Sequence, residues 1–294
     1  MSKSARYAVL GAAGQLGRDF CARLQGDATP LTRADADLTD EGKLRDLLSA
    51  LRPKVVINCA AYNFVDRAET EPEAAFAVNA WGVRHLARTC RDLDCTLVHF
   101  STDYVFGLDE QRRAPYTEAD APGPVSVYGL SKLAGEYLVR ALCPRHFVLR
   151  TCGLYGVWGS GGKGGNFVET MLKRGREGKP LRVVNDQQCT PSYTVDVAAT
   201  AAALMQTDHY GLYHLTNAGS CTWHEFAKAI FDLAGVGADL TSIESNKYAA
   251  PAKRPAFSVL DNAALATLGL PRPRPWQEAL AAYLQERQHL GRTC

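Results

Sequence analysis

Three features are missing from this 294-residue sequence, and each absence excludes a class of protein. No apolar run approaches the roughly 20 residues that a membrane-spanning helix needs, and the N-terminal "MSKSARYAVLGAAG" contains no secretory hydrophobic region. The nine cysteines are odd in number, form no CxxC pair and follow no regular spacing, which is unlike a disulfide framework. We therefore expect a cytoplasmic protein in which the cysteines are mostly small buried apolar residues.

Charge of one sign and clustered metal ligands are also missing. The formal net charge is +2, and lysine and arginine are scattered without a basic block, so no nucleic-acid or membrane-surface partner is expected. Histidine, cysteine and acidic residues do not cluster at the spacing of a metal site, and we predict no bound metal. Hydrophobic residues make up 46% of the chain, which suits a large globular domain with or without a smaller lobe.

The first half contains a regular alternation of short apolar runs and amphipathic stretches. Asp40 stands where it can cap one helix, and Pro72 stands where it can begin another. Continuous apolar strands separated by helices indicate a parallel sheet covered on both faces, so we predict an α/β fold with a Rossmann-type doubly wound sheet. The expected strands are 7–11, 29–32, 54–61, 95–102 and 146–152, and the expected helices are 16–24, 41–51, 72–93 and 127–141.

The second half predicts a smaller C-terminal lobe. The expected elements are helices at 167–177, from 194, at 223–235 and from about 275, and strands at 181–185 and 211–216. Residues 1–152, completed by about 194–217, form the predicted NAD(P)-binding domain. Residues 153–193 and 218–294 form the predicted substrate lobe, with the substrate in the crevice between the two parts.

A glycine motif follows the first expected strand. Gly11, Gly14 and Gly17 give G-x-x-G-x-x-G between this strand and a helix start. Such a turn brings the backbone close to a pyrophosphate, and the free N–H groups of the helix then face the phosphates. The motif predicts a dinucleotide site, and its spacing is similar to that of the extended short-chain dehydrogenase/reductase family. A plain tight turn is the alternative.

The choice of cofactor depends on the residues after the second strand. Arg33 stands where an arginine can bind the 2′-phosphate of NADPH, whereas Asp35 is close enough to leave NADH open. We therefore expect NADPH, with NADH as the alternative.

Tyr128 and Lys132 lie four residues apart in the helical segment "VYGLSKLAGEYL", on one helix face. An ordinary solvated pair has this spacing too. A free tyrosine has a pKa of about 10, and a neighbouring lysine cation can lower it toward the range that general acid catalysis needs. Thr102 ends the fourth strand, where it can hydrogen-bond a substrate carbonyl, and Ser101 is the alternative for this role. These residues predict a reductase in which Tyr128 donates a proton.

The segments "GAAGQLG", "NCAAYNFVDRAE", "FAVNAWG", "STDYVF", "YGLSKLAGE" and "RPAFSVLD" together resemble the dTDP-4-dehydrorhamnose reductase family over roughly residues 6–285. The resemblance implies a nucleotide-sugar substrate, hydride transfer from NAD(P)H to C4 of dTDP-4-dehydro-β-L-rhamnose, and formation of dTDP-L-rhamnose. It also implies that Thr102 and Asp103 hold the sugar. The residues it implies at the cofactor are Gly14, Gln15, Leu16, Asp37, Leu38, Ala61, Tyr62, Asn63, Phe100, Tyr128 and Lys132.

One position departs from the family pattern. Gly153, in "RTCGLYG", stands where members of the family commonly carry a tryptophan that stacks on the sugar. Trp158 could compensate, or it could be a plain loop aromatic. The departure leaves the exact sugar open. Some members bind magnesium through acidic residues, and no persuasive counterpart is present here.

Two residues of the smaller lobe are further candidates for substrate binding. Asn166 begins a helix and could meet the sugar or the base, although a simple N-cap is the alternative. Arg254, in "AKRPAF", could pair with the diphosphate, although a surface salt bridge is the alternative.

Other functions compete with the main hypothesis. The chain could reduce another nucleotide 4-keto-6-deoxy sugar. An epimerase or dehydratase with tightly held NAD is a second enzyme hypothesis, but Tyr104 stands where a dehydratase would be expected to carry glutamate. A non-catalytic subunit resembling the regulatory β subunit of methionine adenosyltransferase is a third. A homodimer is left open.

Overall fold

Six parallel strands form the central sheet of the computed structural model, which describes residues 6–159 and 165–290. In the order β10-β5-β4-β3-β1-β2, the chain leaves β1 toward one edge and returns to β3 on its other side. The carboxyl ends of β1 and β3 therefore form the switch point at which such sheets bind ligands. The strands are β1 Tyr7–Leu10, β2 Ala28–Leu31, β3 Val55–Asn58, β4 Thr96–Thr102, β5 His146–Thr151 and β10 Gly211–His214. The predicted doubly wound α/β fold is confirmed.

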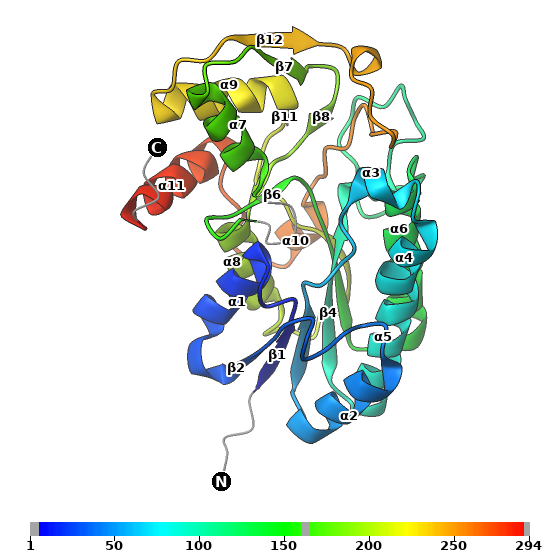
Figure 1. Cartoon of the computed structure of the whole chain (residues 1–294). Helices are drawn as coiled ribbons and strands as arrows, with labels where there is room; N and C mark the ends of the chain where they lie inside the picture. Colours follow the sequence, from blue (N-terminus) through cyan, green and yellow to red (C-terminus); the bar gives the residue numbers. More distant parts are fainter. Residues whose placement is uncertain (1–5, 160–164, 291–294) are drawn as a thin grey trace.

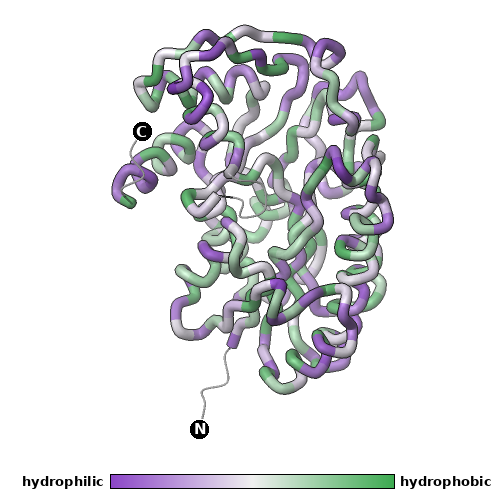
Figure 2. Tube along the Cα trace, viewed as in Figure 1, coloured by the Kyte–Doolittle hydropathy of each residue, from purple (hydrophilic) through white to green (hydrophobic). Residues whose placement is uncertain are grey.

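Helices cover both faces of the sheet (Figure 1). One face carries α1 Gln15–Leu24 and α8 Thr194–Leu204, and the other carries α2 Glu41–Leu51, α5 Val83–Asp92 and α6 Val127–Leu142. Strands β1, β3 and β4 are buried along their whole length because they have packed helices above and below. The same strands form the hydrophobic interior of the lower part of the trace in Figure 2.

The helix expected at 72–93 contains a turn of a different kind. α4 Pro72–Phe76 passes into a π-helical turn, η2 Ala77–Gly82, and then into α5. The prediction of the helix is confirmed, but the π turn was not predicted. Such turns are frequent at functional sites because they re-aim a side chain. Here the turn contains Asn79, whose amide reaches the segment after β3.

The second lobe lies above the carboxyl edge of the sheet (Figure 1). Its core is a cluster of buried aromatic and aliphatic side chains that includes Tyr155, Phe226 and Tyr283. Its larger elements are α7 Phe167–Arg176, α9 Trp223–Ala234, α11 Trp276–His289 and the parallel pair β7 Leu181–Val184 and β12 Leu240–Ile243. The short pairs are β6 Leu154–Tyr155 with β9 Ser192–Tyr193, and β8 Gln188–Cys189 with β11 Cys221–Thr222.

Several short elements complete the chain. They are the helices α3 Val65–Ala68 and α10 Ala263–Thr267 and the 3₁₀ turns η1 Gln25–Asp27, η3 Asp103–Val105 and η4 Ser245–Lys247. The predicted cap of α2 is confirmed, because the Asp40 side chain accepts a hydrogen bond from Lys43 N at 3.0 Å. Strands β6, β8, β9, β11 and β12 and helices α3 and α10 were not predicted. The division into two domains stays a prediction.

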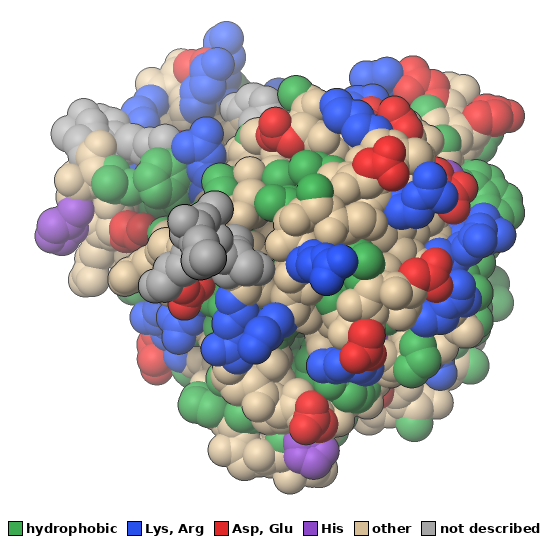
Figure 3. Space-filling model, turned by 90° about the horizontal axis from the view of Figure 1, so that it is seen from below, with side chains coloured by type: hydrophobic (Ala, Val, Ile, Leu, Met, Phe, Trp, Pro, Cys, Tyr) green, Lys and Arg blue, Asp and Glu red, His purple; other side chains and the backbone are tan. Residues whose placement is uncertain are grey.

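The surface carries charges of both signs. In the face seen from below, Lys and Arg side chains alternate with Asp and Glu (Figure 3). Over the described ranges 6–159 and 165–290, no helix is both long and apolar enough to cross a membrane.

Candidate active site

The glycine turn after β1 is shaped by close approaches of the backbone. Gly11 has φ +73°, and a Cβ built on it would lie 2.7 Å from Ala60 N. A Cβ on Gly17 would lie 2.4 Å from the Gly11 carbonyl oxygen, so only glycine lets α1 begin this close to β1. Gly14 is the N-cap residue of α1, with its φ at −79°. The turn therefore has the tight geometry that a pyrophosphate cradle requires.

The next two residues of the turn face in different directions. Gln15 Nε2 donates to the Leu154 carbonyl oxygen at 3.0 Å, which connects the turn to β6 of the second lobe. Gln15 Oε1 is buried without a hydrogen-bond partner among the described residues. Leu16 is buried in the sheet core. Since a buried acceptor normally has a donor, Gln15 Oε1 is suited to a bound group.

Arg33 is the exposed residue of the segment after β2. Its side chain is 85% exposed, and its Nε lies 3.2 Å from Asp37 Oδ2. The Asp37 carboxylate also accepts from Thr39 N and Oγ1, and the backbone hydrogen bond is the main reason why the pKa of Asp37 is lowered. The Asp35 carboxylate accepts hydrogen bonds from Thr32 N and Oγ1, so it is engaged within the turn that these two residues form. Arg33 therefore keeps a largely exposed guanidinium that can meet an anion in addition to Asp37.

Leu38 follows Asp37 in the segment after β2. Its side chain is buried against α5 and η2, and a Cβ on Gly82 would lie 2.7 Å from Leu38 Cβ. Gly82 thus allows the helix to approach the segment after β2.

The segment after β3 is fixed by Asn79. Tyr62 N donates to Asn79 Oδ1 at 2.9 Å, and Asn79 Nδ2 donates to the Tyr62 carbonyl oxygen at 2.9 Å and to Ser131 Oγ at 3.0 Å. Ala61, Tyr62 and Asn63 are held in this way at the carboxyl end of β3, beside the glycine turn. The cofactor contacts proposed for them stay predictions.

Thr102, Tyr128 and Lys132 come together where β4 ends and α6 begins. The Thr102 side chain lies close enough to the Tyr128 phenol to act on its pKa. Lys132 Nζ donates to the Phe100 carbonyl oxygen at 2.5 Å. The Tyr104 ring packs edge-on against Tyr128, with 5.8 Å between the ring centroids. The structure thus joins the two predicted features, the strand end and the tyrosine–lysine helix, in one cluster.

Burial dominates the acid–base properties of this cluster. It raises the pKa of Tyr128 to about 12, and the Thr102 side chain opposes the shift. It lowers the pKa of Lys132 to about 8, while the charge of Glu136 opposes the shift. We expected Lys132 to lower the pKa of Tyr128, but in this structure the desolvation of the phenol outweighs its neighbours. The two values move apart, so in this structure the phenol is a weaker acid and the lysine cation a stronger one than in water.

Asp103 lies directly behind Thr102. Its carboxyl group is buried and accepts hydrogen bonds from Ser258 Oγ at 2.6 Å, Cys152 Sγ at 3.1 Å and Thr102 Oγ1 at 3.2 Å. Burial raises the pKa of Asp103 to about 6. Three donors aimed at one carboxyl group fix its position next to the reacting cluster.

Ser101 has a different environment from Thr102. Its Oγ donates to Glu136 Oε1 at 2.5 Å, and Glu136 forms a fully buried ion pair with Arg150, whose Nη2 lies 2.7 Å from Glu136 Oε2. Ser101 is therefore committed to this pair, whereas Thr102 contacts Tyr128. Of the two candidates, only Thr102 touches the predicted acid.

The space beside Gly153 is occupied by an aromatic side chain from helix α9. Gly153 has φ +51°, and a Cβ on it would lie 3.2 Å from the Trp223 ring. The indole of Trp223 also packs on Phe167, with 4.8 Å between the ring centroids. Trp158 is directed elsewhere, because its Nε1 donates to Asp19 Oδ1 of α1 at 2.9 Å. Trp223, rather than Trp158, is the aromatic residue beside Gly153.

Both substrate candidates of the second lobe are engaged within the protein. Asn166 Oδ1 accepts from Glu169 N at 3.0 Å, and its Nδ2 donates to the Gly156 carbonyl oxygen at 2.9 Å, so it is the N-cap of α7. Arg254 Nη2 lies 2.9 Å from Oδ2 of Asp66, which belongs to α3. The roles of Asn166 and Arg254 toward a substrate stay predictions.

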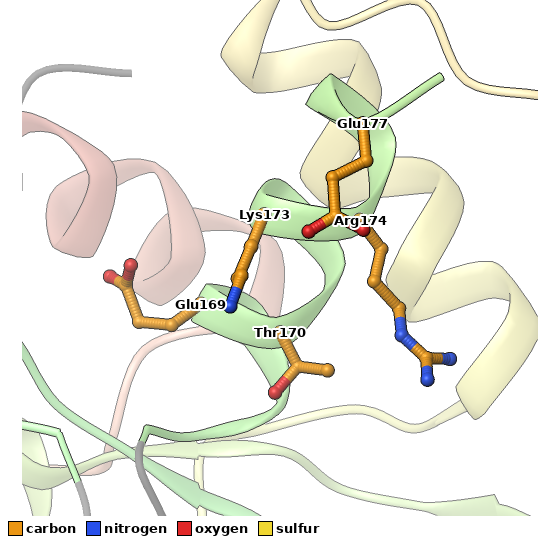
Figure 4. A pocket seen from close by; sticks show the side chains of 5 residues that line it. All are labelled: Glu169, Thr170, Lys173, Arg174 and Glu177. Carbon is orange, nitrogen blue, oxygen red and sulfur yellow. The ribbon is translucent and has the colours of Figure 1, made fainter. Parts of the chain in front are cut away.

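Another hollow on the surface is separate from this cluster. Figure 4 shows it along α7, and its lining side chains come from this helix and the residue that follows it: Glu169, Thr170, Lys173, Arg174 and Glu177. Across the described part of the chain, no group of three or more His, Cys, Asp or Glu is arranged to hold a metal ion.

Sequence reasoning did not single out the residues that support the cluster. Asn79, Glu136 and Arg150 have no local pattern that distinguishes them from helix or strand residues, and Ser258 lies in a stretch for which no helix or strand is predicted. The signal available for Asn79 was its place in "FAVNAWG", and the signal for Glu136 was its place one turn after Lys132.

The chain is similar to proteins of one family. The family described as "RmlD substrate binding domain" matches residues 5–289. The dTDP-4-dehydrorhamnose reductase of Streptomyces griseus is 41% identical over 285 residues, which cover 94% of this chain and 91% of that protein. A dTDP-4-keto-6-deoxy-D-glucose reductase of Streptomyces niveus is 39% identical over 280 residues, with 94% and 95% covered. The crystal structure of the Bacillus anthracis dTDP-4-dehydrorhamnose reductase in complex with NADP superimposes with a TM-score of 0.91 at 36% identity, covering 96% of this chain and 99% of that one.

Proposed function

Because the chain belongs to the family of the RmlD substrate binding domain, we propose that it is an NADPH-dependent reductase that converts dTDP-4-dehydro-β-L-rhamnose to dTDP-L-rhamnose. The observation that carries this proposal is the Thr102, Tyr128 and Lys132 cluster, which lies at the carboxyl end of the sheet next to the glycine turn. The relatives named as reductases cover nearly the whole chain, and one of them was crystallised with NADP.

The residues present fit a nicotinamide dinucleotide. Gly11 and Gly17 let the turn and the start of α1 pack closely, because a Cβ at either position would collide with backbone atoms. Gln15 Oε1 is a buried acceptor that has no donor among the described residues. Arg33 offers an exposed guanidinium for the 2′-phosphate, which favours NADPH over NADH. The residues proposed to hold the cofactor are Gly11, Gly14, Gln15, Leu16, Gly17, Arg33, Asp37, Leu38, Ala61, Tyr62, Asn63, Phe100, Tyr128 and Lys132.

The cofactor supplies the hydride that C4 of the sugar receives. In the proposed mechanism Tyr128 donates its phenolic proton to the C4 oxygen, and Thr102 orients that oxygen. Lys132, held by the Phe100 carbonyl, places a positive charge beside the phenolate that forms and also holds the nicotinamide ribose. Asp103 is proposed to hold the sugar, and Asn166 and Arg254 are proposed for the remainder of the nucleotide sugar.

A second substrate is favoured by one observation. Gly153 is covered by Trp223, an arrangement that differs from a tryptophan at position 153 itself. The crevice next to Asp103 therefore has its own shape. A relative of similar identity is named as a reductase of dTDP-4-keto-6-deoxy-D-glucose. Reduction of this other 4-keto-6-deoxy sugar is the alternative that we carry.

The other hypotheses have less support. Tyr104, which packs on Tyr128, stands where a dehydratase would need an acidic residue. The complete Thr102, Tyr128 and Lys132 set argues against a purely regulatory subunit. We further propose that the enzyme works in the cytoplasm, and light scattering of the purified protein would decide between a monomer and a homodimer.

The test is the oxidation of NADPH with dTDP-4-dehydro-6-deoxyglucose, measured with and without the epimerase that makes the rhamnose precursor. Turnover that requires the epimerase and yields dTDP-rhamnose supports the main proposal. Turnover without the epimerase supports the alternative sugar. No turnover in either reaction, in protein that binds NADPH, would overturn both.

A further inference from the structure

Helix α6 and strand β4 meet through a series of side-chain contacts. Tyr128 and Lys132 lie one helical turn apart and face two alternate positions at the strand end, Thr102 and the Phe100 carbonyl oxygen. Residues four apart on a helix share a face, so the next position in this series is 136. These first two contacts belong to the reaction proposed above.

The third contact is made by Glu136 and is charged. Glu136 Oε1 accepts from Ser101 Oγ at 2.5 Å, between the two strand positions already in use. Both carboxylate oxygens accept from Arg150 of β5, at 2.7 Å to Nη2 and 2.9 Å to Nε. The side chains of both partners are at most 2% exposed. A buried ion pair seldom improves stability over apolar residues of the same volume, so its presence here asks for another reason.

The reason lies in the environment of Lys132. The lysine is buried, and burial disfavours its charged form. Three titratable groups face it: Glu136 from its own helix, Cys59 from the segment after β3, and His99 from β4. Burial lowers the pKa of His99 well below its usual range and raises that of Cys59 well above it. Both groups are therefore neutral at pH 7, and Glu136 is the one anion among the three.

We propose that Glu136, fixed by Arg150, is a positioning residue that keeps Lys132 charged and holds it in register with the end of β4. The proposal rests on the proposed function, in which Lys132 supports Tyr128. Arg150 has the complementary task. It holds the carboxylate in place from β5 and packs over the Phe106 ring, with 5.0 Å from its guanidinium carbon to the ring centroid. His214 lies 3.4 Å from Arg150 and is neutral, because burial lowers its pKa to about 3.

The test uses two variants. Glu136→Gln keeps the size of the side chain and an oxygen that can accept from Ser101, but it removes the charge. Because an unpaired Arg150 destabilises the fold, the double variant E136Q/R150M replaces the pair by uncharged groups of similar volume and is expected to regain stability. In both variants we expect the pKa of Lys132 to fall by about one unit or more. The pKa is read by NMR of protein labelled with ε-¹³C-lysine, which does not require turnover.

The rate of reduction provides the second readout. The alkaline limb of the pH dependence of kcat should move to lower pH by the same amount in both variants, with kcat near pH 8 reduced several-fold. The control is Glu169→Gln, which breaks the ion pair with Arg287 in the second lobe and should lower stability without moving this limb.

Two outcomes would overturn the inference. One is a Lys132 pKa that does not change in Glu136→Gln. The other is a double variant in which both the stability and the pH of the alkaline limb return to the parental values, because the ion pair would then have a structural role only. A failure of the proposed function is recognised separately, because the parent protein would then bind NADPH without oxidising it, and a Tyr128→Phe variant that still reduces the substrate would remove only the acid role of Tyr128.

Discussion

At the scale of single residues, the balance between burial and charge decides which groups can exchange protons. Tyr128 and Lys132 are both removed from water, yet each keeps a polar contact to β4. We expect Tyr128→Phe to lower kcat by about 10²–10⁴-fold, because the hydroxyl is the proposed general acid. NADPH affinity, measured by fluorescence titration, should stay within a few-fold of the parent value. A variant with near-parental kcat would remove Tyr128 from the mechanism.

Asp19 of α1 gives a stability prediction with a defined pH dependence. Burial raises its pKa to about 6 from 3.8, so between these pH values the folded state holds a proton that the unfolded state has released. The cost of burying this carboxylate is therefore absent below pH 4 and complete above pH 6. Asp19→Asn, which can still accept from Trp158 Nε1, should raise the free energy of unfolding at pH 7.5 by up to about 3 kcal/mol.

The measurement for Asp19 is urea unfolding at two pH values. At pH 5 the stabilisation by Asp19→Asn should be about half that at pH 7.5, since the native carboxyl group is already largely protonated there. An equal change at both pH values would mean that packing, and not ionisation, sets the effect.

At the scale of elements, the glycine turn joins sequence and function most directly. A Cβ on Gly17 would lie 2.4 Å from the Gly11 carbonyl oxygen, and the obstacle is backbone that cannot move aside cheaply. We expect Gly17→Ala to displace the start of α1 and to weaken NADPH binding at least ten-fold. The matched control is Gly26→Ala, because nothing lies within 4 Å of a Cβ at that position. Calorimetry of NADPH binding to both variants checks this, and equal affinities would contradict it.

Elements were predictable where burial produces a pattern in the sequence. The strands of the sheet are continuous apolar runs. The N-caps of helices α2 and α9 are Asp40 and Thr222, and both residue types are favoured at this position. Strand β12 was not predictable because its residues are partly exposed, and β8 and β11 are only two residues long. Short exposed segments form through partners distant in sequence, which no local pattern reports.

The same distinction applies to the candidate site. Thr102, Tyr128 and Lys132 were predictable because their spacing and place at element ends carry the chemistry. Asn79 and Ser258 were not, because their function depends on contacts across 17 and 155 residues of sequence, with Tyr62 and Asp103. Long-range polar contacts of this kind require the fold itself.

At the scale of the whole molecule, polar contacts join the central sheet and its helices to the second lobe. Gln15 reaches Leu154, Ser258 reaches Asp103, and a two-pronged ion pair joins Arg274 to Asp196 of α8. These contacts hold the second lobe over the carboxyl edge of the sheet.

The Arg254–Asp66 ion pair is the contact that a substrate could replace. Arg254 donates to Asp66 and to the Ala252 carbonyl oxygen, and its side chain is 20% exposed. A diphosphate carries more negative charge than the Asp66 carboxylate and offers more acceptors, so a bound nucleotide sugar would compete with Asp66 for the guanidinium. Part of the free energy of nucleotide binding would then be used to break the Arg254–Asp66 ion pair.

This competition predicts opposite effects for the two partners of the pair. Asp66→Asn removes the competing charge and should tighten the binding of dTDP several-fold. Arg254→Gln removes the cation and should weaken binding by about ten-fold or more, the size of one charge-assisted hydrogen bond. The double variant should match Arg254→Gln, because the competing charge acts on the nucleotide through the arginine, and an amide oxygen at position 66 can still accept from Ala252 N. Calorimetric titration with dTDP alone measures all three proteins. If Asp66→Asn weakens binding as Arg254→Gln does, the pair holds the segment around residue 254 in shape, and the arginine does not change partners when the nucleotide binds.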